Sequence, residues 1–338
     1  MIEYKTGNLL EDPSEALINT VNTVGVMGKG IALQFKQAYP DMFREYQRAC
    51  RNDEVVTGRM HVVSTNALVG PKYIINFPTK RHWKEKSKMS YITEGLKDLK
   101  QVVEDLGIQS IAVPPLGCGN GGLEWKDVRS MIEETFGESS IRVHVYPPAG
   151  SPEPDKMIIS TTKPRMTETR ALLLASLYDY MKPGYRLSLL EIQKIAYFLQ
   201  EAGEPLNLNF EKNKYGPYAE KLNFVLQRLE GHYIRGYGDR NRDSDIHLIN
   251  AAGLNAYDYL TQKERNHERL KKVESIIDGF ENPYGMELLA TVHWIQKNHE
   301  PKTDEELILE VQSWNDRKKE LFMPKYIVKA NNHLKEVL

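Results

Sequence analysis

The chain has few cysteines and no long apolar run, and these absences exclude several classes of protein. Only two of its 338 residues are cysteine, Cys50 and Cys118, and they form neither a disulfide framework nor a metal-ligand pattern. We therefore expect a reducing, cytoplasmic compartment and no metal site. No apolar run could span a bilayer, and Met1–Lys5 holds an acid and no apolar core, so we expect no membrane helix and no signal peptide.

An excess of charge of either sign is also missing. Lys and Arg number 45 and Asp and Glu 46, which gives a net charge of −1. Residues 1–150 hold 18 of each sign, and the remainder holds 27 basic and 28 acidic residues. This balance argues against broad electrostatic capture of duplex DNA but permits a local basic groove. The length and the 41% hydrophobic content favour two domains with packed cores.

Two glycine-rich segments form the strongest motif in the chain. The first, Val24–Gly30, follows the apolar run Ala16–Val21, and the second, Pro114–Gly122, follows the run Ser110–Val113. A glycine loop between a strand and a helix presents bare backbone N–H groups to phosphate, because side chains would block its approach. For the first loop the alternative is a tight turn that needs positive φ. Two such loops in one domain predict a diphosphate held from both sides, as in a nucleotide sugar such as ADP-ribose.

The first 146 residues alternate strand-like runs with helical patterns. Beyond the two runs above, strands are expected at 60–64, 73–77 and 141–146, and the apolar spacing predicts a helix over 91–106. Such alternation predicts an α/β fold with a mostly parallel or mixed sheet and helices on its faces. Ligands of such folds bind beyond the carboxyl ends of the strands, where both glycine loops fall.

A proline-rich segment marks a change of pattern. Four prolines between Pro147 and Pro154 cannot continue a sheet. We expect a domain over 1–148, a linker over 149–165 and a mainly α-helical domain over 166–338. Helices of the second domain are expected at 167–180, 187–202, 219–229, 256–277, 286–299 and 303–314, with a short β-rich insert between 231 and 249.

Asparagines and histidines supply the first candidate polar groups. Asn19 and Asn22 flank the end of the first strand, where such a side chain either hydrogen-bonds a ribose hydroxyl or satisfies the backbone of the turn. His61 and His144 lie on strand-like segments, and we expect them to be hydrogen-bonded structural residues rather than ligands.

The ordered set of motifs resembles the macrodomain family over the whole of residues 1–146. The set consists of Gly7–Leu9, Ala16–Asn22, Gly28–Ala32 and Pro115–Leu123. Within that family, Asn76–Lys84 and Leu123–Trp125 resemble the branch that contains the terminal ADP-ribose protein glycohydrolase. The resemblance implies a macrodomain with a mixed sheet flanked by helices, which binds ADP-ribose and needs no cofactor.

The resemblance also implies the residues of the site. Lys80 occupies the position of the catalytic lysine of the branch, and Asn22 is the second candidate for a catalytic role. Asn8 stands where most macrodomains carry an adenine-contacting Asp, and Asn120 or Gly121 stands where the protein-deacylating relatives use an Asp. ADP-ribose is expected to contact Asn8, Leu9, Asn19, Val21, Gly28, Gly30, Ile31, Thr79, Leu116, Gly117, Cys118, Gly119, Asn120 and Gly121.

Two chemical roles are open to Lys80. Cleavage of an N-glycosidic bond passes through an oxocarbenium-like state. A neutral amine can attack the ribose carbon, but nearby phosphates favour the charged form. An ammonium can instead protonate or stabilise a departing thymine anion, and we prefer this role.

The run from Lys80 to Lys88 interleaves cations with aromatic rings. Cations bind phosphate and rings stack on bases, so the run suits single-stranded DNA. The expected DNA contacts are Arg81, His82, Trp83 and Lys84. A solvated loop rim is the alternative.

The second half resembles a helical antitoxin-associated module, the SocA or Panacea-like domain, over Leu187–Gln200 and Phe210–Tyr218. This resemblance brings no catalytic residue. It implies an antitoxin whose helical domain binds a DarT-like ADP-ribosyltransferase toxin, and Glu305, Glu306 and Glu310 are candidates for an acidic patch that contacts the toxin.

The two resemblances together imply an ADP-ribosyl glycohydrolase that removes ADP-ribose from thymidine bases of single-stranded DNA. Its implied partners are the toxin and the modified DNA, with no membrane. Two alternatives stay open, a non-catalytic reader of ADP-ribose and a hydrolase of ester-linked protein ADP-ribose. Lys80 at the motif position favours an enzyme, and the missing Asp counts against the ester hydrolase.

Overall fold

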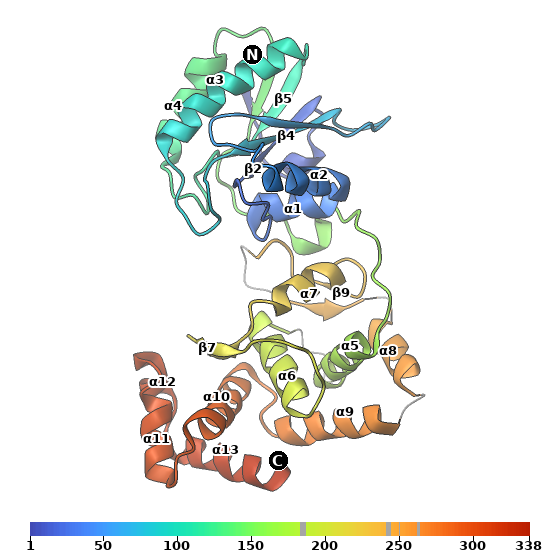
Figure 1. Ribbon diagram of the computed structural model, residues 1–338, viewed down its shortest axis with the longest axis vertical. Coiled ribbons are helices and arrows are strands. Elements are labelled where there is room, and N and C mark those ends of the chain that lie inside the picture. Colours follow the sequence, from blue (N-terminus) through green and yellow to red (C-terminus); the bar gives the residue numbers. More distant parts are fainter. Residues whose placement is uncertain (183–186, 241–244, 250, 262–263) are drawn as a thin grey trace. The chain divides into compact units, whose positions relative to one another are not determined.

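The computed structural model describes residues 1–182, 187–240, 245–249, 251–261 and 264–338 (Figure 1). These residues fall into two compact units. The first contains Met1–Thr162 and the described part of the segment 238–242. The second contains Lys163–Tyr237 and the described residues from 245 onward.

A six-stranded mixed sheet forms the centre of the first unit (Figure 1). The strand order is β1-β6-β5-β2-β4-β3, and all neighbours are parallel except β4 and β3. This confirms the predicted mixed sheet. The strands are β1 (Ile2–Tyr4), β2 (Ala16–Val21), β3 (His61–Ser64), β4 (Tyr73–Pro78), β5 (Ser110–Val113) and β6 (Arg142–Val145).

Helices cover both faces of this sheet (Figure 1). On β2, Ile18 packs into the core beneath α3 and α4, whereas its neighbour Leu17 packs into the core beneath α1 and α2. Successive strand residues point to opposite faces, so a strand covered on both sides reads as a continuous apolar run. The helices are α1 (Gly30–Ala38), α2 (Pro40–Arg51), α3 (Met89–Asp105) and α4 (Trp125–Phe136).

The second unit is mainly helical, and none of the helices in the described part of the chain is long and apolar enough to cross a membrane. Two short antiparallel sheets, β7–β8 and β9–β10, accompany the helices. The elements are α5 (Glu168–Met181), α6 (Leu189–Glu201), β7 (Glu211–Asn213), β8 (Gly216–Tyr218), α7 (Leu222–Leu229), β9 (Ile234–Arg235), β10 (His247–Leu248), α8 (Ala252–Leu260), α9 (Glu264–Ile277), α10 (Pro283–His299), α11 (Asp304–Gln312), α12 (Asp316–Leu321) and α13 (Pro324–Val337).

Side-chain caps start several of these helices. Thr167, Asn282 and Thr303 each accept a backbone N–H in the first turn of α5, α10 and α11. Ser188 and Glu191 form a reciprocal capping box at the start of α6. Such caps satisfy N–H groups that have no partner within the helix, and each stabilises its helix by about 1 kcal/mol.

One predicted helix of this unit is wrong. The expected helix over 256–277 is two helices, α8 and α9, and residues 262–263 of that prediction lie outside the described residues. Apolar residues keep a helical spacing in both α8 and α9, so a prediction from periodicity alone treats the two helices as one. The β-rich insert corresponds to β9 and β10, although its residues 241–244 lie outside the described part. The helices α12 and α13 were not predicted.

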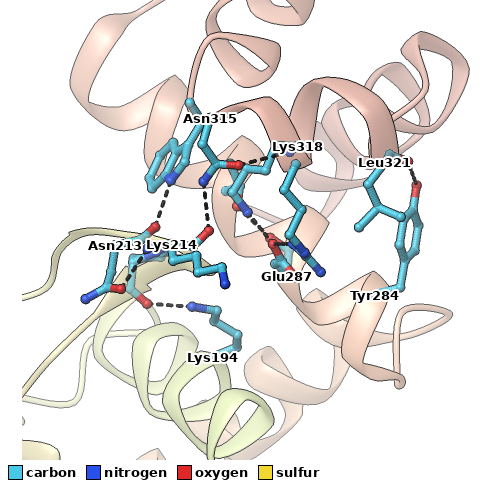
Figure 2. A network of polar contacts seen from close by, with 12 residues as sticks. Lys194, Asn213, Lys214, Tyr284, Glu287, Asn315, Lys318 and Leu321 are labelled. Atoms are coloured by element: carbon cyan, nitrogen blue, oxygen red, sulfur yellow. Dashed lines mark hydrogen bonds and ion pairs between the residues drawn. The ribbon is translucent and has the colours of Figure 1, made fainter.

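A buried ionic cluster joins two helices of the second unit, and a lysine of a third helix lies near it (Figure 2). Arg317 and Lys318 of α12 both bind Glu287 of α10. Lys194 of α6, which is 1% exposed, donates its Nζ to the carbonyl oxygen of Pro217 at 2.6 Å. Burial lowers the pKa of Lys194 to about 7 and the pKa of Lys318 to about 8.

Side chains near this cluster fix the β7–β8 hairpin (Figure 2). The indole Nε1 of Trp314 donates to the Asn213 carbonyl at 2.8 Å, and the Asn315 amide donates to the Lys214 carbonyl at 3.0 Å. Side chains from α6 and from the segment before α12 therefore hold the hairpin backbone in place.

Candidate active site

Three adjacent parallel strands end at one edge of the sheet. β2 lies between β5 and β4. The first glycine loop follows β2, the second follows β5, and Lys80 follows the last residue of β4, Pro78. The carboxyl ends of neighbouring parallel strands meet at the same edge, so the topology gathers the two loops and the lysine.

Asn22 shapes the first loop. Its Oδ1 accepts the N–H groups of Val24 and Val26 at 3.0 and 3.3 Å, and its Nδ2 donates to the Val26 carbonyl at 2.6 Å. The Tyr46 hydroxyl donates to the Asn22 carbonyl at 2.7 Å. Gly25, at the turn of this loop, has φ +75°. The amide of Asn22 is therefore used within the loop, while its predicted catalytic role stays a prediction.

Asn19 lies deeper in the sheet. Its side chain is fully buried and donates to Oδ1 of Asn76 at 2.9 Å, and Asn76 in turn contacts Nδ1 of His61 at 3.2 Å. Burial lowers the pKa of His61. His144 contacts the Asp12 carboxylate at 2.9 Å. Both histidines are hydrogen-bonded to neighbouring side chains, as expected.

Asn8 and the start of α1 are the other predicted contacts on this side. Asn8 caps the short 3-10 helix Leu9–Glu11, with its Oδ1 accepting from Leu10 N–H at 3.1 Å. Gly30 is the first residue of α1 and has φ +62°, so the glycine is required there. Gly28 leaves the loop open, since a Cβ at this position would meet only Val26, at 3.8 Å.

The glycines of the second loop have different roles. Gly117 has φ +71°, which favours glycine for conformational reasons. At Gly121 a Cβ would lie 2.3 Å from both the Gly117 carbonyl oxygen and Oγ of Ser87, so this position is closed by packing. At Gly119 a Cβ would meet nothing within 4 Å. Packing therefore does not require a glycine at 119, and the open space leaves room for a ligand to approach the backbone.

Cys118 is not an activated nucleophile. Burial, and then the negative charge of Glu124, raise the pKa of its thiol to about 11. The thiol donates weakly to the Leu116 carbonyl at 3.5 Å. Since the thiolate is the reactive form, Cys118 stays protonated near neutral pH.

Lys80 connects the end of β4 to the second loop. Its Nζ donates to the carbonyl oxygen of Asn120 at 3.2 Å, and this is its only hydrogen bond within the described part of the chain. Partial burial and then the positive charge of Lys86 lower the pKa of Lys80. The preceding residue, Thr79, is buried, and its N–H donates to the Val21 carbonyl at 3.0 Å.

The segment after Lys80 is tied to both loops. The N–H and hydroxyl of Thr23 both donate to the Arg81 carbonyl, at 3.1 and 2.9 Å. The N–H of Ser87 donates to the Gly121 carbonyl at 3.0 Å. Thr23, Lys86 and Ser87 were not predicted as parts of the site. For Lys86 and Ser87 the only signal in the sequence is the basic run itself, and for Thr23 it is the position next to Asn22 and the first glycine loop.

Cations and rings alternate along this segment. The rings of His82 and Trp83 lie 5.4 Å apart, and Trp83 is 48% exposed. Lys84 lies over the Trp83 ring at 5.0 Å, and Arg81 lies over the Tyr91 ring at 6.0 Å. The surface thus offers an exposed aromatic face flanked by positive charge.

Within the described residues no group of three or more His, Cys, Asp or Glu side chains could hold a metal ion.

Known proteins are similar to this chain in sequence. The model of the Macro domain family matches residues 18–132. A Thermus aquaticus protein named DNA ADP-ribosyl glycohydrolase is 48% identical over 319 residues, which are 94% of this chain and 89% of that protein. This chain belongs to the DNA ADP-ribosyl glycohydrolase, or DarG, family. The macrodomain fold, the hydrolase class and the antitoxin family predicted from the sequence are thereby confirmed.

Two further comparisons cover parts of the chain. The solved macrodomain of Mycobacterium tuberculosis DarG is 55% identical to the matching part of this chain, with a TM-score of 0.44. The match covers 44% of this chain and 99% of that structure. A Thermosipho africanus protein, named as a DNA ADP-ribosyl transferase–DNA ADP-ribosyl glycohydrolase fusion, is 35% identical over 164 residues, 44% of this chain and 42% of that protein. In that DarG relative, transferase and glycohydrolase share one chain.

Proposed function

We propose that this DarG-family chain removes ADP-ribose from thymidine bases of single-stranded DNA, and that its first unit carries the reaction. The observation that carries the proposal is the position of Lys80 at the edge where β2, β4 and β5 end: it follows β4, beside the first glycine loop, and its Nζ reaches the Asn120 carbonyl of the second. The loops supply backbone N–H groups for a diphosphate. The family name supports the DNA-linked substrate.

Lys80 acts as an ammonium in this reaction. The bond between the ribose carbon C1″ and the thymine nitrogen breaks, and its electron pair goes to thymine. Lys80 gives thymine a proton, while a water oxygen bonds to C1″ and releases a proton to solvent. The products are unmodified DNA and ADP-ribose. A proton donor at the leaving group contributes roughly 10²–10⁴-fold to the rate.

The charge around Lys80 supports this role. Within the described residues, the ammonium donates to a carbonyl and to no carboxylate. A carboxylate placed there would be needed to activate water or to attack C1″ in the way of many glycosidases. The site offers a cation to a departing anion instead, which suits a nucleobase more than an alkoxide leaving group.

The DNA strand lies on the segment that follows Lys80. Arg81, His82, Trp83 and Lys84 present the exposed ring and its flanking cations beside the reacting bond. Stacking of a base on an aromatic side chain stabilises binding of single strands by roughly 1–3 kcal/mol. Unpaired DNA exposes its base faces for this contact, whereas duplex DNA does not.

One incubation tests the function. The chain is mixed with an ADP-ribosylated thymidine oligonucleotide and, separately, with a protein that carries ester-linked ADP-ribose, and free ADP-ribose is measured. We expect release from the oligonucleotide only. Release from the protein alone would assign the ester hydrolase, and binding without release from either would assign a reader of ADP-ribose.

The second unit binds the toxin, which we propose to be a DarT-like ADP-ribosyltransferase. The fusion of transferase and glycohydrolase in the Thermosipho relative supports such a partner. The match to the Thermus relative covers both units of this chain, so that relative also has the helical half. Glu305 and Glu306 are exposed on α11. Glu306 accepts the Lys302 N–H at 2.6 Å and Glu310 pairs with His299 at 2.9 Å, so Glu305 is the carboxylate most available to the toxin.

A further inference from the structure

Lys86 is the one basic side chain of the segment 80–88 that has no ring, ion pair or hydrogen bond in the described structure. Lys80 donates to Asn120, and the other cations of the segment lie over aromatic rings: Lys84 over Trp83, and Arg81 and Lys88 over Tyr91. The Lys86 ammonium is therefore available to a ligand.

The backbone places this ammonium over the second glycine loop. The neighbouring Ser87 is buried, donates its N–H to Gly121, and packs its side chain against Gly117. A Cβ on Gly122 would lie 3.1 Å from Nζ of Lys86. Ser87 thus anchors the segment to the loop, and Lys86 reaches across the space that Gly122 leaves.

Two like charges lie near each other at the second glycine loop, since Lys80 bonds to Asn120 and Lys86 lies beside Gly122. Lys86 is near enough to Lys80 to lower the pKa of Lys80 through its positive charge. No carboxylate forms an ion pair with either lysine in the described part of the chain. Like charges held together without a counter-ion destabilise each other, and an anion between them removes that cost.

We propose that Lys86 is a second cation of the reaction site and binds a phosphate group of the substrate. The inference rests on the proposed function, because the substrate named there carries phosphate in two places. One is the diphosphate of ADP-ribose, and the other is the phosphodiester beside the modified thymidine. Lys86 is a substrate-binding residue in this scheme, and Lys80 remains the proton donor.

The test compares Lys86→Gln with the unchanged chain on three ligands: free ADP-ribose, ADP-ribosylated thymidine nucleoside, and the same nucleoside within an oligonucleotide. A loss of about tenfold in kcat/KM on the oligonucleotide alone, with the log–log salt slope reduced by about 0.7, assigns the phosphodiester. An equal loss of affinity for all three ligands assigns the diphosphate. Lys86→Arg retains the charge and should retain most of the activity.

Lys100→Gln is the matched control, because Lys100 is an exposed lysine on α3, roughly 16 Å along that helix from Met89. Unchanged kinetics and affinity of Lys86→Gln on all three ligands would overturn the inference. Absence of turnover by the unchanged chain would instead contradict the proposed function. In that case the affinities for intact ADP-ribosylated nucleoside and oligonucleotide, which need no turnover, still decide the role of Lys86.

Discussion

The Lys80 ammonium donates to the carbonyl oxygen of Asn120 at 3.2 Å. Lys80 follows β4 and Asn120 belongs to the loop after β5, so this hydrogen bond spans the carboxyl end of β2, the strand between them. A carbonyl oxygen orients an ammonium without neutralising it. The site therefore retains a positive charge beside the second glycine loop.

Replacement of Lys80 should separate turnover from binding. We expect Lys80→Ala to lower kcat roughly 10²–10⁴-fold, because the leaving thymine loses its proton donor. The dissociation constant for ADP-ribose, measured by calorimetry, should change little, since backbone N–H groups of the loops hold the diphosphate. A twofold loss of kcat would argue against the catalytic role.

The pH dependence of kcat should report the charge state of Lys80. Burial and Lys86 lower the pKa of Lys80. If the ammonium is the active form, kcat falls as the pH rises through this pKa. Lys86→Gln removes the repulsion and raises the pKa of Lys80, so the falling limb should move to higher pH. Lys100→Gln should leave the limb in place, and a kcat that rises over the same range would assign the neutral amine.

Two glycines of the second loop should respond differently to alanine. A Cβ at Gly119 meets no protein atom, so Gly119→Ala should leave the melting temperature unchanged. It should weaken ADP-ribose binding by about 10- to 100-fold if it blocks one charged hydrogen bond. Gly121→Ala forces its Cβ against Gly117 and Ser87 and should cost about 1–3 kcal/mol of stability. Equal affinity of Gly119→Ala and the unchanged chain would remove Gly119 from the binding surface.

Sequence patterns located the sheet edge but not the contacts across it. The strands β2 and β5 are mostly apolar, and a glycine loop follows each, so apolar content and glycine content were sufficient to find them. The hydrogen bonds from Thr23 to Arg81 and from Ser87 to Gly121 join residues far apart in the chain. Such pairs follow from the strand order, which a single sequence does not encode locally.

The helical half shows the same limit. A capping residue marks the start of α6, and its apolar spacing predicted that helix. Lys194 carries no sign in the sequence that it is buried, because lysine is ordinarily an exposed helix residue. Its burial depends on packing against α10 and β8, which the residues around it in the sequence do not reveal.

Toxin binding should survive loss of hydrolysis. We expect the full-length Lys80→Ala chain to bind a DarT-like toxin and to block fresh DNA modification, because the toxin contacts lie in the second unit. The same chain should fail to clear DNA that is already modified. A pull-down with the fragments 1–162 and 163–338 checks the assignment, and toxin retained only by the fragment 1–162 would contradict it.

The buried Lys194 should make the second unit more stable as the pH rises. Its pKa is about 7 in the folded chain and about 10.5 in the unfolded one, so between these values the unfolded state binds the extra proton. The free energy of unfolding therefore increases with pH in this window, by up to about 1.4 kcal/mol per pH unit. Lys194→Met cannot take up this proton, so its free energy of unfolding should rise less steeply with pH. The remaining rise comes from Lys318, whose pKa is lowered to about 8.

Hydrogen exchange of α6 and α10 in the full chain, measured from pH 7 to 9.5 and corrected for intrinsic rates, follows the local stability. Identical pH slopes for the two chains would show that Lys194 is charged in the folded protein throughout this range.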